Sequence, residues 1–225
     1  MESARHLSFL GRLIGDPARA SILDSLLDGS SHTAGDLAVK ARISPQSASG
    51  HLSKLLKGRF PSVTVDGRRR LYRLAGRHVA VGLENFLAAI PQEHPVQPGG
   101  LTPFLYVRSC YDHLAGAVAV KLASSLLERR VLEAGRQELI LTHSAEALLR
   151  DLGINLALLR NSRRKFAPKC LDWSEKRPHI GGSLGAAFLQ SMLNNRWIAR
   201  LPHERALRLT PVGKAGFRKY FMLDV

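Results

Sequence analysis

The feature that most constrains the fold is a pair of helix-start signals separated by one short helix and a tight turn. Thr33 stands three residues before Asp36, the arrangement of a capping box, and predicts a short helix that ends near Ala41. Ser44-Pro45 predicts a second helix over residues 45–57, because serine is a preferred N-cap and proline is favoured at the first helical position. A short helix, a three-residue turn and a second capped helix form a helix-turn-helix arrangement.

The segments on either side extend this pattern. Asp16-Pro17 predicts an earlier helix, which Asp28-Gly29 ends. Residues 63–74 contain two β-rich runs around Asp66-Gly67, a strong signal for a tight hairpin. Arginines 68–70 follow at its tip. A hairpin with a basic tip directly after a helix-turn-helix predicts a wing that holds phosphate or enters a minor groove.

The second helix of the pair presents short polar side chains and donors, which suit base edges and phosphates in a major groove. Composition agrees, because a net charge of +15 and a pI near 10.7 attract a polyanion. Both halves of the sequence are basic, so charge alone does not locate the binding face. The predicted contacts with double-stranded DNA are Ser44, Gln46, Ser47, Ser49, His51, Lys54, Arg68, Arg69 and Arg70.

These stretches resemble the ArsR-type (arsenic-repressor-like) winged-helix repressors of bacteria. The resemblance covers roughly residues 13–74 and rests on LIGDPARASILDSLL, TAGDLAVKARISPQSASGHLSKLLKG and VDGRRRLYRL. It implies that residues 45–57 are the recognition helix and residues 66–70 the wing. It also implies a homodimer formed through flanking helices near residues 3–14 and 77–90.

The residues themselves support the predicted dimer. An apolar stripe at helical spacing covers more of one helix face than a small monomer needs. It consists of Val79, Leu83, Phe86, Leu87 and Ile90. The alternative is that the stripe packs within its own subunit. The resemblance carries over DNA binding but not the family's thiolate metal site, because that cysteine cluster falls on residues 34–41, which contain no cysteine.

The positions of proline and glycine residues predict two domains. Residues 93–103 are rich in proline and glycine and predict a linker between a domain at 1–92 and a domain at 104–225. The expected fold class is mainly α with small β-hairpins (α+β). No apolar run approaches the ~18 residues of a membrane span, and the N-terminus lacks a secretory signal. We therefore expect a cytoplasmic protein without a membrane partner.

The second domain contains an internal sequence repeat. Cys-x-Asp, then His followed by two small or apolar residues, then Leu-Thr recur in one order at nearly one spacing. This predicts two degenerate helix-strand-strand-helix repeats, at about 104–155 and 166–221, in which each histidine opens a long apolar helix. Residues 205–217 also resemble the last strand and following helix of many winged-helix domains, so a winged-helix-like second domain is expected.

The repeats bring cysteine, aspartate and histidine into matched positions. Thiolate and imidazole suit zinc or another thiophilic divalent metal, and a carboxylate completes or orients such a set. Two alternatives stay open: a reactive thiol pair that senses oxidants, or purely structural residues in which the aspartates cap helices. The candidate residues are Cys110, Asp112, His113, Cys170, Asp172 and His179.

Other side chains of the second domain suggest further ligands. Trp173 and Trp197, with Phe166 and Phe188, either line an apolar pocket or belong to the core. The basic run at 160–166 contacts DNA or an anionic ligand, or is a solvated linker.

Together these features predict a sequence-specific transcriptional regulator. We expect a homodimeric repressor whose second domain senses a metal ion, an oxidant or a small ligand. One alternative is a thiol-dependent enzyme with Cys110 or Cys170 as nucleophile. The sequence has no glycine-rich phosphate loop, nucleophile elbow or HExxH helix, so we do not expect an enzyme. Another alternative is a DNA-architectural protein that receives no signal.

Overall fold

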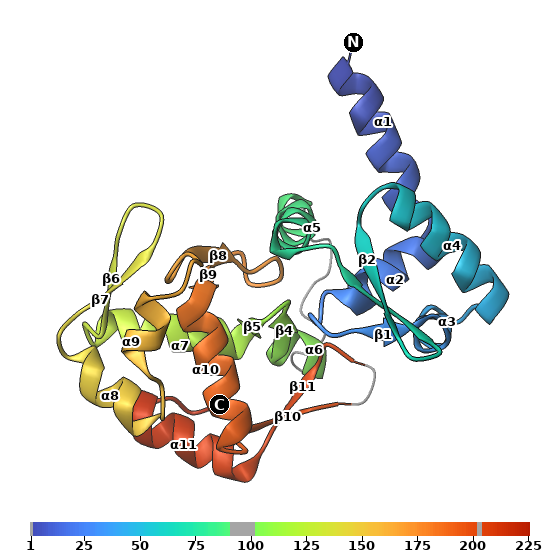
Figure 1. The fold of residues 1–225 in the computed structure, drawn as a ribbon. Coiled ribbons are helices and arrows are strands. Elements are labelled where there is room, and N and C mark those ends of the chain that lie inside the picture. The colour runs from blue at the N-terminus through green and yellow to red at the C-terminus, as the bar shows by residue number, and fades with distance from the viewer. Residues whose placement is uncertain (1, 91–101, 202–203) are drawn as a thin grey trace. The chain divides into compact units, whose positions relative to one another are not determined.

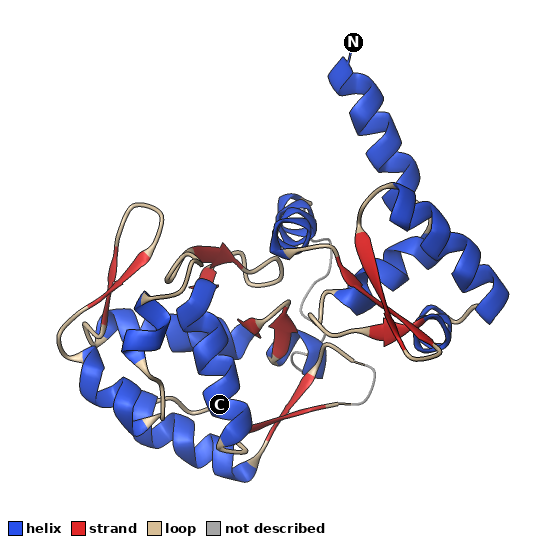
Figure 2. Cartoon of the chain, viewed as in Figure 1, coloured by secondary structure: helices blue, strands red, loops and turns tan. Residues whose placement is uncertain are grey.

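The computed structural model describes residues 2–90, 102–201 and 204–225. Its contacts divide the chain into two units, Met1–Leu83 and Glu84–Val225, and the division falls inside helix α5 (Arg77–Ala89). Nearly all of the predicted linker at 93–103 lies outside the described residues. Figure 2 shows that helices dominate both units and that the strands are short, which confirms the predicted mainly α class with small hairpins.

The first unit has the predicted helices and hairpin in the predicted order, with one short additional strand before the helix-turn-helix (Figure 1). Besides the start of α5, its elements are α1 (Glu2–Ile14), α2 (Pro17–Leu26), β1 (His32–Thr33), α3 (Ala34–Ala41), α4 (Pro45–Lys57), β2 (Pro61–Asp66) and β3 (Arg69–Leu74). The three strands form an antiparallel sheet in the order β1-β3-β2. Helices α3 and α4 with the hairpin β2–β3 therefore make a winged helix-turn-helix.

Local capping determines where these helices begin. Thr33 and Asp36 bond reciprocally at the start of α3: Thr33 Oγ1 accepts from the Asp36 backbone N at 3.1 Å, and an Asp36 carboxylate oxygen accepts from the Thr33 backbone N at 2.9 Å. Ser44 accepts from the Ser47 backbone N at 3.1 Å and starts α4. Between the helices, the backbone of Arg42 adopts the left-handed conformation, with φ 54°, and this reverses the direction of the chain. The predicted capping box and N-cap are both confirmed.

The core of the first unit comes from the apolar sides of these helices. Ile22, Leu26, Leu37, Leu52 and Leu55 are each almost completely buried. In the hairpin, β2 and β3 pair antiparallel, from Pro61 opposite Leu74 to Asp66 opposite Arg69. Gly67 takes φ 58° in the two-residue turn, a conformation that glycine adopts without strain.

The second unit contains the predicted repeat, with one more hairpin in each copy than the sequence suggested. The first copy comprises β4 (Arg108–Cys110), β5 (His113–Ala115), α7 (Ala117–Glu128), β6 (Leu132–Ala134), β7 (Leu139–Leu141) and α8 (Ala145–Asp151). The second comprises β8 (Lys169–Leu171), β9 (Pro178–Ile180), α10 (Gly182–Asn194), β10 (Ile198–Arg200), β11 (Leu207–Leu209) and α11 (Pro211–Phe221). Helix α6 (Pro103–Tyr106) precedes the first copy, and α9 (Leu156–Arg160) lies between them.

The additional hairpins correct one prediction. His113 and His179 do not open helices; they lie on strands β5 and β9. Gly116, with φ 86°, separates β5 from α7, and a Cβ there would lie 2.7 Å from the carbonyl oxygen of Leu105. Gly182, with φ 72°, ends the corresponding turn at the start of α10. The glycines after each histidine mark the end of a strand.

The two copies pack crosswise. Helix α10 of the second copy packs on β5 of the first, α7 packs on β9, and β5 contacts β9. The first hairpins of the two copies are consequently neighbours. Behind them, α7 and α10 are buried along most of their length in one shared core. No helix among the described residues is long and apolar enough to span a membrane.

Candidate functional site

An open groove runs between the start of α3, helix α4 and the wing. Its polar lining consists of hydroxyl, ammonium and guanidinium side chains, which are the types that proteins commonly use to contact phosphates and base edges. The lining residues are Thr33, Ala34, Gly35, Ser49, Ser53, Leu56, Lys57, Arg68, Arg69, Arg70 and Tyr72. The groove contains all three wing arginines, which are exposed, so the fold brings the predicted recognition helix and wing to one surface.

The predicted contact residues on α4 differ in how they are held. Gln46 and Lys54 are exposed along the helix. Ser49 is exposed too, but its hydroxyl donates to the Pro45 carbonyl oxygen at 3.0 Å. His51 is half-buried, with Nδ1 3.5 Å from a carboxylate oxygen of Asp16.

Ser44 and Ser47 have a structural part in the same helix. The Ser44 side chain is the N-cap of α4 and accepts from the backbone N of Ser47, whose side chain is half-buried. Among the predicted contacts on α4, Gln46 and Lys54 are therefore exposed but do not line the groove, Ser49 lines it, and Ser44 caps the helix.

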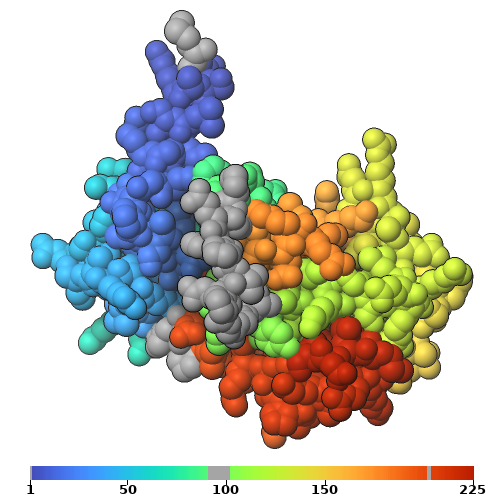
Figure 3. All heavy atoms as spheres, turned by 180° about the vertical axis from the view of Figure 1, so that it is seen from behind, coloured from blue at the N-terminus to red at the C-terminus, as the bar shows by residue number. Residues whose placement is uncertain are grey.

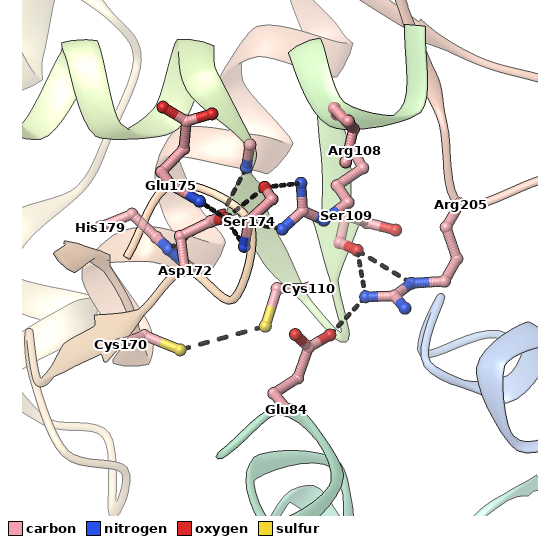
Figure 4. Close-up of polar contacts among 12 residues, drawn as sticks. Glu84, Arg108, Ser109, Cys110, Cys170, Asp172, Ser174, Glu175, His179 and Arg205 are labelled. Atoms are coloured by element: carbon pink, nitrogen blue, oxygen red, sulfur yellow. Dashed lines mark hydrogen bonds and ion pairs between the residues drawn. The ribbon is translucent and has the colours of Figure 1, made fainter. Parts of the chain in front are cut away.

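A second cluster lies in the second unit, where the first hairpins of the two copies meet. Cys110 on β4 pairs across its hairpin with His113 on β5, and Cys170 on β8 pairs with His179 on β9. One ligand atom from each of these four residues lies within 4.8 Å of the other three. The two sulfur atoms are 4.0 Å apart. Figure 4 shows the two thiols directed toward each other. The matched placement that the repeat predicted has thus produced a real cluster.

The dimensions and chemistry of the cluster fit a small soft cation. Two sulfurs bound to zinc at ~2.3 Å in a tetrahedron are about 3.8 Å apart, close to the separation of Cys110 and Cys170. The Nε2 atoms of His113 and His179 are buried without a hydrogen-bond partner, which is costly unless a ligand satisfies them. The hydrogen bond between the two thiols, together with burial, raises the pKa of the Cys110 thiol to about 12.

Each histidine has an aspartate on its other nitrogen. A carboxylate oxygen of Asp112 lies 3.2 Å from Nδ1 of His113, and one of Asp172 lies 3.5 Å from Nδ1 of His179. A carboxylate at Nδ1 orients an imidazole so that Nε2 serves as the ligand atom. Asp112 therefore orients His113 through a hydrogen bond, whereas Asp172 lies beside His179 as a nearby charge and leaves His179 Nδ1 without a hydrogen bond. Neither aspartate belongs to the four-ligand cluster, and neither caps a helix among the described residues.

Asp172 is bound into the fold by a residue that the sequence did not single out. Arg108 Nη2 donates to Asp172 at 2.8 Å, and both side chains are completely buried. The Gly116 backbone N donates to the other carboxylate oxygen at 2.7 Å, and the Ser174 hydroxyl donates at 2.7 Å. Burial would raise the pKa of Asp172, but the Arg108 guanidinium, the His179 imidazole and these donors hold the pKa well below the usual carboxyl range. Figure 4 shows Asp172 at the centre of these contacts.

The tryptophans and the basic run that the sequence singled out lie in different parts of the second unit. The Trp173 ring packs on the Arg108 guanidinium, 4.8 Å from its centre, whereas Trp197 packs against Phe217 and Phe221 in the core. The two tryptophans therefore belong to different clusters. In the basic run at 160–166, Arg164 donates to Asp112 at 2.7 Å, so this run is tied to the carboxylate beside His113.

A helix-turn-helix with a basic wing and groove defines the first unit as a winged helix-turn-helix DNA-binding domain. The chain is 42% identical over 223 residues to the HTH-type transcriptional regulator YdfF of Bacillus subtilis, an alignment that covers 98% of this chain and 99% of YdfF. The chain therefore belongs to the HTH-type transcriptional regulators. No family model matches it.

Other similarities are shorter. The HTH-type transcriptional regulator CmtR of Mycobacterium tuberculosis is 35% identical over 92 residues, which are 41% of this chain and 77% of CmtR. The solution structure of CmtR, titled a cadmium metal-sensor, covers 39% of this chain and 94% of its own, with 33% identity and a TM-score of 0.32. The structure of NolR from Sinorhizobium fredii covers 38% of this chain and 84% of its own, with 29% identity and a TM-score of 0.35.

Proposed function

We propose that the protein is a homodimeric, sequence-specific regulator whose second unit binds a thiophilic metal ion and thereby changes DNA binding. The observation that carries the proposal is the convergence of Cys110, His113, Cys170 and His179, two from each copy of the repeat. Two cysteines and two histidines are a donor set typical of structural zinc sites.

DNA recognition is assigned to α4 and the wing. Gln46 is a side chain that pairs with adenine in a major groove, and Lys54 suits guanine or a phosphate. Arg68, Arg69 and Arg70 are exposed at the wing and neutralise phosphates or enter the minor groove. In this assignment α4 carries sequence preference and the wing carries affinity.

Dimerisation is assigned to α1 and α5. Leu7 and Phe9 on α1 are 67% and 44% exposed. Phe86 on α5 is 50% exposed, and Ile90, which directly follows α5, is 44% exposed. In Figure 3 the dark-blue helix α1 stands out from the other atoms of the first unit. A second copy of the chain would cover these apolar side chains and would present two recognition helices to the two halves of a palindromic site.

The ligand set suggests how a metal signal acts on the protein. The ion would supply bonds to both hairpins at once. His113, held at Nδ1 by Asp112, would keep its Nε2 atom directed at the ion, and the Asp172 charge beside His179 would favour the imidazole there. Because each copy gives one thiol and one imidazole, only one relative position of β4–β5 and β8–β9 completes the set. Binding therefore favours that position, and a preference of this kind changes DNA affinity if the DNA-binding conformation differs in it.

The test uses full-length protein purified with zinc and analysed for metal content and operator affinity. We expect one zinc ion per chain, and a change in operator affinity when a chelator removes it. His113→Asn should lose the ion and the response together, whereas His143→Asn, a matched change at an exposed histidine, should keep both.

Two results would contradict the metal proposal. One is zinc content that is the same in the His113→Asn variant and the wild type. The other is operator affinity that is insensitive to zinc and to cadmium, and this result would favour the architectural role. Near-ultraviolet circular dichroism of each variant shows whether the second unit is folded.

A further inference from the structure

The two thiols of the cluster are related in a way that metal binding does not require. Cys110 and Cys170 are the only cysteines of the sequence and come from different copies of the repeat. Both are free thiols, and their sulfur atoms are already in contact distance at 4.0 Å. A disulfide needs a separation of about 2.05 Å, so closing the bond requires a relative movement of about 2 Å.

We propose that Cys110 and Cys170 form a reversible intramolecular disulfide when a hydroperoxide oxidises the protein, and that this disulfide and a bound metal ion exclude each other. The exclusion rests on the proposed metal site, whereas disulfide formation stands on the sulfur geometry alone. The two states exclude each other because a bound ion and a second sulfur compete for the same sulfur lone pairs. They also require different separations, about 3.8 Å around zinc and about 2.05 Å in a disulfide.

The order of the steps follows from exposure. Cys110 is 3% exposed, whereas Cys170 is half-buried, so an incoming peroxide reaches Cys170 first. The Cys170 sulfur attacks one peroxide oxygen, the S–O bond forms and the O–O bond breaks. The departing oxygen takes the thiol proton and, from hydrogen peroxide, leaves as water. Cys170 is now a sulfenic acid, two electrons more oxidised than the thiol.

Cys110 completes the reaction. Its sulfur attacks the Cys170 sulfur, the S–S bond forms and the S–O bond breaks. The departing hydroxide takes the Cys110 proton and leaves as a second water. In sum, two thiols and one hydrogen peroxide give one disulfide and two waters, and the two electrons come from the two sulfurs. A thiol reductant reverses the step by exchange.

The consequence for the fold is a covalent link between β4 and β8. The metal ion and the disulfide both join the two copies of the repeat, but they hold the hairpins at different separations. The same cluster would thus report two signals: hydroperoxide would expel the ion, and the ion would protect the thiols.

The experiment follows thiols, mass and zinc in the full-length protein. Metal-free protein treated with hydrogen peroxide should lose both thiols and about 2 Da within a single chain, and dithiothreitol should restore both. Zinc-loaded protein should lose its thiols several-fold more slowly and should release one ion for each disulfide formed. Cys110→Ser should stop at the oxidised Cys170 and form no intrachain bridge.

His179→Asn separates this inference from the metal proposal. It removes one metal ligand and leaves both thiols, so it should form the disulfide and lose the protection by zinc. If wild-type protein binds no zinc but forms the disulfide, the metal proposal and the exclusion fail and the disulfide stands. Oxidation of Cys170 to sulfinic acid with Cys110 unchanged, or disulfides only between chains, would overturn the disulfide. Unchanged thiol loss in zinc-loaded protein would overturn the exclusion.

Discussion

Arg108 and Asp172 form an ion pair of 2.8 Å in the interior of the second unit, although 64 residues separate them in the chain. The pair joins the first hairpin of one copy to the first hairpin of the other, beside the cysteines and histidines. Asp172 also accepts from the Gly116 backbone N, where β5 ends. The position of the cluster therefore depends on a buried charge pair.

We expect Asp172→Asn to lower the free energy of unfolding by about 3–5 kcal/mol, because it leaves the Arg108 guanidinium buried without a counter-charge. Urea unfolding followed by tryptophan fluorescence measures the change. The matched control is Asp224→Asn, which breaks the pair of Arg218 with Asp224. Both side chains of that pair are more than two-thirds exposed. A loss as small as that in the control would contradict the structural importance of the buried pair.

Replacing Arg68, Arg69 and Arg70 together with alanine should weaken binding to every duplex, because these arginines are assigned to phosphates. If each neutralises one phosphate, the slope of log affinity against log salt should become shallower by about 0.9 per arginine. Fluorescence anisotropy at several salt concentrations gives the slope. Alanine at Arg136, Arg200 and Arg208 removes the same charge from exposed positions of the second unit. Equal slopes for the two triple variants would exclude the wing assignment.

Gln46→Ala should act differently from the wing substitutions. An amide side chain that pairs with a base edge contributes about 1–3 kcal/mol of discrimination, so its loss should relax sequence preference at one position of each half-site. Competition between the operator and single-base variants measures this. Affinity that falls equally for all duplexes would instead assign Gln46 to the backbone.

Leu7→Glu and Phe86→Glu should yield monomers with weaker operator binding, because each places a charge in the proposed dimer interface. Both positions are exposed within one chain, so the monomer fold should be unaffected. Val212→Glu, at an apolar residue on α11 that is 60% exposed, is the control and should stay dimeric. Light scattering at micromolar concentration gives the mass. A wild-type protein that is monomeric under these conditions would disprove the interface.

Asp28 should make the first unit sensitive to acid. Burial would raise its pKa, but hydrogen bonds from His32 and the Ser30 backbone N, with the Lys40 charge, lower the pKa below the ordinary value. A carboxyl with a lowered folded-state pKa stabilises the fold above its ordinary pKa of about 4, and this contribution disappears as pH falls through the folded-state value. Asp28→Asn should therefore flatten the acid limb of stability against pH. Asp66→Asn, an exposed control, should leave that limb unchanged.

The first unit could be predicted almost element by element, because its signals are local. Thr33, Ser44 and Asp16 each cap a helix within three residues, and the two-residue turn Gly67-Arg68 that follows Asp66 needs no distant partner. The capped starts of α2, α3 and α4 and the hairpin agree with the expectation. The basic tip follows from the turn alone.

The second unit was predictable only where its internal repeat showed through. The matched cysteines and histidines indicated that two half-sets might meet, and they do. The sequence nevertheless predicted that the histidines begin helices, whereas they lie on strands. The spacing of apolar residues does not show the turns at Gly116 and Gly182, which separate these strands from the helices that follow. Arg108 was missed because its partner lies in the other copy, and a single arginine beside apolar residues gives no signal of burial.

The equal division of the ligands between β4–β5 and β8–β9 has a consequence for how such a domain could have arisen. One copy holds a thiol and an imidazole, which is half of a four-coordinate set. A chain with only one copy would complete the set by pairing with a second chain. Duplication within one gene then converts an affinity that depends on protein concentration into one that does not, and leaves each copy free to diverge outside its hairpin.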